Sequence, residues 1–106
     1  MKAGLELHFT IWKEINSETN KIDLTFNQAQ ALIFLKDNFG VTMTKIAKEV
    51  GLTTAAITGL IDRLVEKGLV QRKYDLKDRR VIFAEITNKG KVKVRQFLSI
   101  FKRRIP

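Results

Sequence analysis

Two short helical patterns on either side of Gly51 constrain this chain more than any other feature of its sequence. Before Gly51, apolar residues spaced by three and four predict one buried face on a helix over Met43–Val50. They are Ile46, Ala47 and Val50. Gly51 favours the left-handed conformation that ends a helix, because it has no Cβ atom to clash. After it, the spacing predicts a second helix over Thr54–Lys67, ended by Gly68.

The second helix is amphipathic, and the N-terminal half of its outer face is small and polar. The apolar face consists of Ile57, Leu60, Ile61 and Leu64. The opposite face consists of Ala55, Thr58, Gly59, Asp62 and Glu66. Thr42 and Thr53 stand where a side-chain oxygen caps a helix. Two helices joined by so short a turn are typical of a protein that lays the second helix in the DNA major groove, although plain core packing also explains them.

Two strand-like runs, residues 69–74 and 81–86, follow the second helix. They are rich in β-branched and aromatic residues and enclose a short polar connection, which predicts a β-hairpin. The connection carries three cations, Lys77, Arg79 and Arg80, against two aspartates. A basic hairpin beside such a helix can reach the neighbouring minor groove or the DNA backbone. The alternative is a solvated turn whose charges have no binding role.

The segments before the first helical pattern predict two further helices. Leu5, Phe9, Trp12 and Ile15 fall at helical spacing. They predict a helix from Leu5 to about Ser17, followed by a polar loop over residues 16–21. Thr25 and Gln28 form a capping-box pattern at the start of a largely apolar helix that ends near Asn38.

Thr87 is placed to cap a last helix over residues 88–104. This helix carries an apolar stripe that we interpret as a dimer seam, because a small domain does not leave so large a stripe in water. The stripe consists of Val94, Phe97, Leu98, Phe101 and Ile105. A short strand at Val41–Thr42 is expected beside the hairpin.

The predicted fold is therefore mainly α-helical with a small β-hairpin, in a single domain over residues 1–106. It is a winged helix-turn-helix flanked by N-terminal (1–20) and C-terminal (88–106) dimerisation helices. The DNA-binding lobe is predicted over residues 24–87.

The charge of the chain favours a polyanionic partner. The formal net charge is +9. Residues 69–106 hold twelve basic and three acidic side chains, so the whole surplus lies in the hairpin and the last helix. Nucleic acid is the leading candidate, and an anionic membrane surface is the competing one.

Several classes of function are not supported by the residues present. There is no cysteine, which excludes disulfides and thiolate metal sites. The single histidine, His8, has no partners for a metal site, and no catalytic constellation is visible, so we expect no enzyme activity, metal or cofactor. No apolar run approaches the roughly 18 residues that a membrane span needs. Polar residues interrupt the N-terminus, so no signal peptide is visible. We expect a cytoplasmic protein with no membrane partner.

A set of short motifs lies in order between Leu24 and Gly90. They are Leu24-Thr25-Phe26-Asn27-Gln28, Ile46-Ala47, Gly51-Leu52-Thr53, Ile57-Thr58-Gly59-Leu60-Ile61-Asp62-Arg63-Leu64, Lys67-Gly68-Leu69-Val70, Arg72, Asp78-Arg79-Arg80 and Ile86-Thr87-Asn88-Lys89-Gly90. With these motifs, nearly two thirds of the chain resembles the MarR (multiple-antibiotic-resistance regulator) family of prokaryotic transcription factors.

The resemblance implies a homodimer on a pseudo-palindromic DNA operator. In each subunit the second helix of the pattern, called the recognition helix, enters a major groove, and the basic hairpin, called the wing, places Arg79 in the minor groove. Together with the charge pattern it gives the expected DNA-binding residues: Thr53, Thr54, Ala55, Ala56, Thr58, Gly59, Arg63, Arg72, Lys77, Arg79 and Arg80. The expected dimer-interface residues are Leu5, Phe9, Trp12, Val94, Phe97, Leu98, Phe101 and Ile105. Relatives usually run longer and complete the dimer with a further C-terminal helix. The dimer here is therefore smaller, differently arranged or completed by another segment.

Two departures from the family pattern affect DNA recognition. Ala55, Ala56 and Gly59 present no long hydrogen-bonding side chain, which favours close approach, methyl contacts to thymine and readout of DNA shape. Leu76 stands where relatives often have proline, so a more mobile wing tip is expected.

The resemblance also implies a small-molecule effector that shifts the dimer between two spacings of its recognition helices. Aromatic residues are the candidates to line its pocket, although core packing explains them equally well. They are Phe9, Trp12, Phe34 and Phe39. The alternative function is a winged helix that contacts another protein and binds no DNA.

Overall fold

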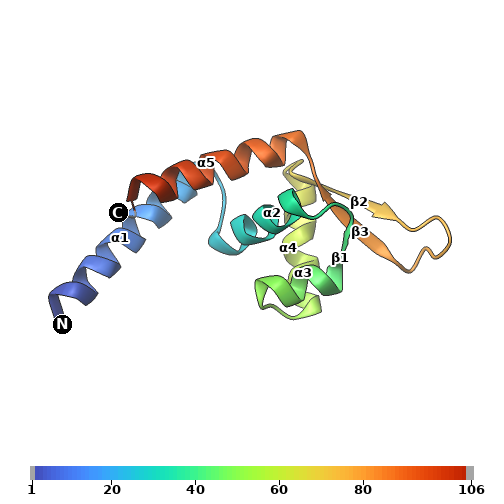
Figure 1. Ribbon diagram of the computed structural model, residues 1–106, viewed down its shortest axis with the longest axis horizontal. Helices are drawn as coiled ribbons and strands as arrows, with labels where there is room; N and C mark the ends of the chain where they lie inside the picture. Colours follow the sequence, from blue (N-terminus) through green and yellow to red (C-terminus); the bar gives the residue numbers. More distant parts are fainter. Residues whose placement is uncertain (1, 105–106) are drawn as a thin grey trace.

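The computed structural model describes residues 2–104 of the chain, with side chains for residues 9–103. Five helices and three strands occur in this part of the chain: α1 (Lys2–Lys21), α2 (Phe26–Asp37), β1 (Val41–Thr42), α3 (Met43–Val50), α4 (Thr54–Glu66), β2 (Val70–Tyr74), β3 (Ile82–Ile86) and α5 (Asn88–Arg104). Figure 1 shows an elongated molecule in which α1 and α5 form an arm, and α2 to β3 form a lobe at its other end. The predicted fold class, mainly α with a small antiparallel sheet, is confirmed.

Helix α1 is longer than the sequence pattern predicted. The expected polar loop over residues 16–21 is wrong, because the helix continues to Lys21. Ile15 and Thr19 lie one helical turn apart and are both buried, and the Thr19 hydroxyl donates to the Asn16 carbonyl within the helix at 3.1 Å. Asn16 and Ser17 face water, whereas Glu18 is half-buried and pairs with Arg103 of α5 at 3.9 Å. Contact with α5 therefore extends the helix past its apparent polar break.

Helix α2 begins at the predicted capping box. The Gln28 backbone N–H donates to the Thr25 hydroxyl at 3.2 Å, and the Thr25 N–H donates to the Gln28 side-chain oxygen at 3.1 Å. The side chains of Ala29, Leu32 and Leu35 are buried in the centre of the lobe. The helix thereby forms the platform on which α3, β3 and α5 pack.

The three strands form one antiparallel sheet in the order β1-β3-β2. Val41 pairs with Ala84 in β3, which confirms the short strand predicted at Val41–Thr42. On the other side of β3, Arg72 pairs with the same Ala84, and Val70 pairs with Ile86. The hairpin is therefore tied to the lobe along its base, while its tip projects away from the helices (Figure 1).

The C-terminal helix starts inside the lobe and leaves it along the arm. The Thr87 hydroxyl accepts from the Gly90 N–H at 3.1 Å, which confirms the predicted cap of α5. Gly90 is buried against the Leu69 carbonyl oxygen and the Ile86 side chain. A side chain at this position would overlap both, so the close crossing of α5 over the sheet edge requires glycine.

The apolar stripe of α5 divides between the lobe core and the surface. Val94 and Phe97 were expected at a dimer interface, but they are 1% and 4% exposed and pack in the core of their own chain. That part of the prediction is corrected, because contacts within one chain already cover both side chains. Leu98 remains 39% exposed. The side chain of Leu5, and the whole of Ile105, lie outside the residues that the structure describes.

Candidate nucleic-acid interface

The helix-turn-helix has the capped geometry that the sequence predicted. The Thr42 hydroxyl accepts from the Lys45 N–H at 3.4 Å, and the Thr53 hydroxyl accepts from the Ala56 N–H at 3.1 Å. Gly51 has φ = 78°, the left-handed conformation expected between the two helices. Each helix end is therefore satisfied locally, which fixes the start of α4 relative to α3.

The outer face of α4 is exposed and built from small side chains. Ile57, Ile61 and Leu64 are fully buried on the inner face. Five of the predicted DNA-binding residues lie on the exposed part of the first two turns: Thr54, Ala55, Ala56, Thr58 and Gly59. The Thr58 hydroxyl donates to the Thr54 carbonyl at 2.9 Å, so its proton is already used within the helix. The face is thus slim and offers few hydrogen-bond donors.

The wing tip is held by two aspartates. The Asp75 carboxylate accepts from the backbone N–H groups of Lys77 and Asp78, at 2.7 and 3.2 Å. The Asp78 carboxylate accepts from both the backbone and the guanidinium of Arg80. These bonds, the side-chain one first, lower the pKa of Asp78. The connection between β2 and β3 is therefore an ordered turn, in which the two aspartates hold the backbone that carries the cations.

The predicted basic residues fall into two groups. Arg80 is paired with Asp78 at 3.1 Å, and Arg72 of β2 is paired with Asp62 of α4. Arg79, Lys77 and Arg63 are exposed and have no ion pair among residues 9–103. The paired arginines stiffen the wing and join it to α4, whereas the unpaired cations present their full charge to a ligand.

Asp62 lies on this surface but was not among the DNA-binding residues predicted from the sequence. Its carboxylate joins the outer face of α4 to the strand that leads to the wing, through Arg72. A carboxylate on a face expected to meet phosphates is unfavourable unless it is neutralised, and Arg72 neutralises it. Nothing in the sequence pairs these two residues, because the contact depends on how β2 packs beside α4.

The aromatic residues expected to line an effector pocket do not gather in one place. The Trp12 ring packs edge-on against Phe26 and Phe101, with ring centres 5.6 and 6.1 Å apart. Phe34 lines a separate hollow beside Val50, and Phe39 lines another beside the wing. The grouping of these residues into a single pocket is therefore corrected.

The small exposed face of α4, the short turn before it and the cationic hairpin after it define a winged helix-turn-helix protein. The model of the MarR family matches residues 22–81, which is more than half of the chain. The chain belongs to the MarR family. No helix within residues 2–104 is long and apolar enough to cross a membrane.

Curated proteins of similar sequence support the same family. The chain is 39% identical over 67 residues to the HTH-type transcriptional repressor YetL of Bacillus subtilis (strain 168), covering 63% of this chain and 40% of YetL. It is 32% identical over 89 residues to the HTH-type transcriptional repressor MdtR of the same organism, covering 84% of this chain and 57% of MdtR. The chain therefore spans about half the length of these relatives.

Solved structures share the fold. The YusO protein from Bacillus subtilis superposes with a TM-score of 0.89 at 30% identity, covering 96% of this chain and 73% of YusO. MepR of S. aureus in complex with DNA superposes with a TM-score of 0.82 at 25% identity, covering 97% of this chain and 85% of MepR. The two curated relatives are named as transcriptional repressors, and neither is named as an enzyme.

Proposed function

We propose that this chain is a sequence-specific double-stranded DNA-binding transcriptional regulator. The small-residue face of α4 enters a major groove, and the wing between β2 and β3 places Arg79 in the adjacent minor groove. One observation carries the proposal most directly: Arg79 is exposed and without an ion pair among residues 9–103, on a turn that two aspartates hold in shape. An unpaired guanidinium on an ordered turn is suited to the negative potential of a narrow minor groove. The family and the DNA complex of MepR support the same function.

The mode of readout follows from the size of the side chains on α4. Ala55, Ala56 and Gly59 are exposed and short, so the helix backbone can approach the base edges closely. Methyl groups of alanine and threonine complement the thymine methyl group, while long bidentate donors to guanine are missing from the first two turns. We therefore propose that A·T-rich half-sites and their groove shape carry much of the specificity.

We further propose that the functional unit is a homodimer formed through the arm. Phe9 is 67% exposed and Trp12 39% exposed on α1, and Leu98 lies exposed on α5. A two-fold dimer buries such a surface against its own copy, and its two α4 helices then match an operator with inverted half-sites. A small effector that favours one separation of these helices would shift the dimer towards or away from DNA. Such a regulator acts in the cytoplasm.

Selection of bound duplexes from a random pool tests the proposal. We expect an inverted repeat whose half-site centres are about one helical turn, or 10 base pairs, apart. Titrating the selected duplex at several salt concentrations should give a log–log slope that steepens by about 0.9 for each phosphate neutralised. Sedimentation at several protein concentrations should show a dimer. A chain that binds no duplex at low salt would refute the function, and a monomer at high concentration would refute the dimer.

A further inference from the structure

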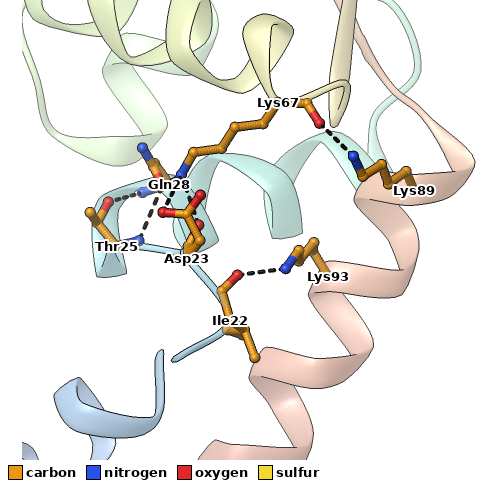
Figure 2. A network of polar contacts seen from close by, with 7 residues as sticks. All are labelled: Ile22, Asp23, Thr25, Gln28, Lys67, Lys89 and Lys93. Atoms are coloured by element: carbon orange, nitrogen blue, oxygen red, sulfur yellow. Dashed lines mark hydrogen bonds and ion pairs between the residues drawn. The ribbon is translucent and has the colours of Figure 1, made fainter. Parts of the chain in front are cut away.

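A cluster of three lysines joins the arm, the start of α2 and the end of α4. We define the lysine network as Lys67, Lys89 and Lys93 with the atoms they contact. Figure 2 shows the ammonium groups of Lys67 and Lys93 directed at the turn between α1 and α2, and that of Lys89 directed at the Lys67 carbonyl. Lys67, the residue after α4, sends its ammonium group to the turn between α1 and α2. There it donates to the Asp23 carbonyl at 2.7 Å and to the Gln28 side-chain oxygen at 3.1 Å, and it pairs with the Asp23 carboxylate at 3.3 Å.

The other two lysines close the junction from α5. Lys89 donates to the Lys67 carbonyl at 3.0 Å, and Lys93 donates to the Ile22 carbonyl at 2.5 Å. The turn is thereby linked to α4, α4 to α5, and α5 back to the turn (Figure 2). Main-chain carbonyls accept three of these bonds, so the network restrains the backbone of each segment directly.

Asp23, which Lys67 contacts through both its carbonyl and its carboxylate, has a left-handed backbone conformation. The Leu24 N–H donates to the Thr19 carbonyl and the Asp23 N–H to the Asn20 carbonyl, both at 3.0 Å, which is the Schellman pattern that ends a helix. Asp23 occupies its left-handed position with φ = 56°, the only such residue other than glycine in the described part of the chain. Glycine adopts this conformation with less strain, and Gly68 occupies the same position after α4.

We propose that Lys67 is a positioning residue that fixes the angle of α4 against the arm, and with it the separation of the two recognition helices in a dimer. This inference rests on the proposed function. An aspartate at position 23 gives Lys67 a carboxylate as well as a carbonyl to hold, which a glycine would not. The contact joins the lobe to the arm at the point where the chain passes from one to the other. Its loss leaves the angle between them to the Lys93 bond and to the packing of α5 in the core, so that angle is held less firmly.

The test compares duplexes that carry the two selected half-sites at the selected spacing and at spacings one and two base pairs longer or shorter. The parent chain is expected to discriminate strongly among them. The informative variant combines Lys67→Met with Asp23→Gly. The first change removes the link, and the second relieves the strained conformation at residue 23, so that the thermal stability of the double variant stays close to that of the parent.

The preference of the double variant for the selected spacing is expected to fall about fivefold or more. Fivefold is the lower end of the coupling measured between distant sites in proteins. Binding to a duplex with a single half-site should stay close to that of the parent, because the double variant loses one positive and one negative charge. Lys36→Met, which removes one exposed lysine outside the network, is the control that shows the effect of a lost charge alone. A double variant that discriminates spacing as sharply as the parent would overturn the positioning role. A parent chain that binds no duplex would instead refute the proposed function.

Discussion

Two glycine substitutions in helices should change stability in opposite directions, and the difference comes from tertiary packing alone. Gly59 in α4 and Gly90 in α5 both lie within a helix, where helix propensity favours alanine by about 1 kcal/mol. A Cβ atom added to Gly59 meets nothing within 4 Å. A Cβ atom added to Gly90 would lie 2.7 Å from the Ile86 side chain and still closer to the Leu69 carbonyl oxygen.

The magnitude for Gly90→Ala follows from these contacts. Overpacking of a well-packed core costs about 1–3 kcal/mol. The Leu69 oxygen is main-chain, and it accepts from the Thr87 N–H at 3.0 Å, so moving it away weakens a buried hydrogen bond as well. Such a bond contributes about 1 kcal/mol. After subtracting the gain in helix propensity, we expect Gly90→Ala to destabilise the fold by about 2 kcal/mol. The control Gly59→Ala should stabilise it by about 0.5–1 kcal/mol.

Urea unfolding of the parent and both variants at one protein concentration measures the two effects, because the stability of a dimer depends on concentration. The midpoint should fall for Gly90→Ala and rise for Gly59→Ala, with equal slopes. A Gly90→Ala chain as stable as the parent would show that α5 does not cross the sheet edge as closely as described. That result would also contradict the packing account of why this position requires glycine.

Three further predictions concern the DNA surface. Arg79→Ala should weaken operator binding by about 1–3 kcal/mol and leave the urea midpoint unchanged, because Arg79 has no ion pair among residues 9–103; equal affinities of variant and parent in a titration would remove the wing from the mechanism. Gly59→Gln, on an exposed helix face, should not lower stability, because glutamine like alanine favours a helix over glycine, yet it should reduce operator affinity, because the longer side chain blocks close approach; unchanged binding would exclude that approach. The hydrogen bonds from Arg80 lower the pKa of Asp78 from 3.8, so their stabilisation of the wing is present above that value and is lost as the pH falls through the lower folded pKa. NMR signals of the Arg80 N–H groups should therefore shift only in acid, and a transition near neutral pH would contradict the assignment.

The local signals in the sequence were sufficient for most element boundaries. Threonine at the start of α2, α3, α4 and α5 caps each helix as predicted, because a cap depends on residues only three apart. Gly51 and Gly68 both have the predicted positive φ. The predicted end of α1 was wrong for the opposite reason: its last turn is held by burial of Thr19 against other parts of the chain, which no local pattern reports.

The candidate DNA surface could be predicted only in outline. The small residues of α4 and the cations of the wing could be named from spacing and charge, because each lies on a short, regular element. Which of the cations are free to bind DNA could not be predicted, since the pairing of Arg72 with Asp62 depends on how a strand packs beside a helix. The stripe of α5 was misassigned in part because an apolar face looks the same whether its own lobe or a second subunit covers it.

The sequence alone determined the class of fold, the position of the helix-turn-helix and the sign of the charge on the wing, because these depend on periodicity, caps and composition over a few residues. Only the tertiary structure decided that Val94 and Phe97 are core, that Gly90 has no room for a side chain, and that Lys67 joins α4 to the turn after α1. Those features arise between segments distant along the chain, where contact geometry, and not residue type, sets the interaction.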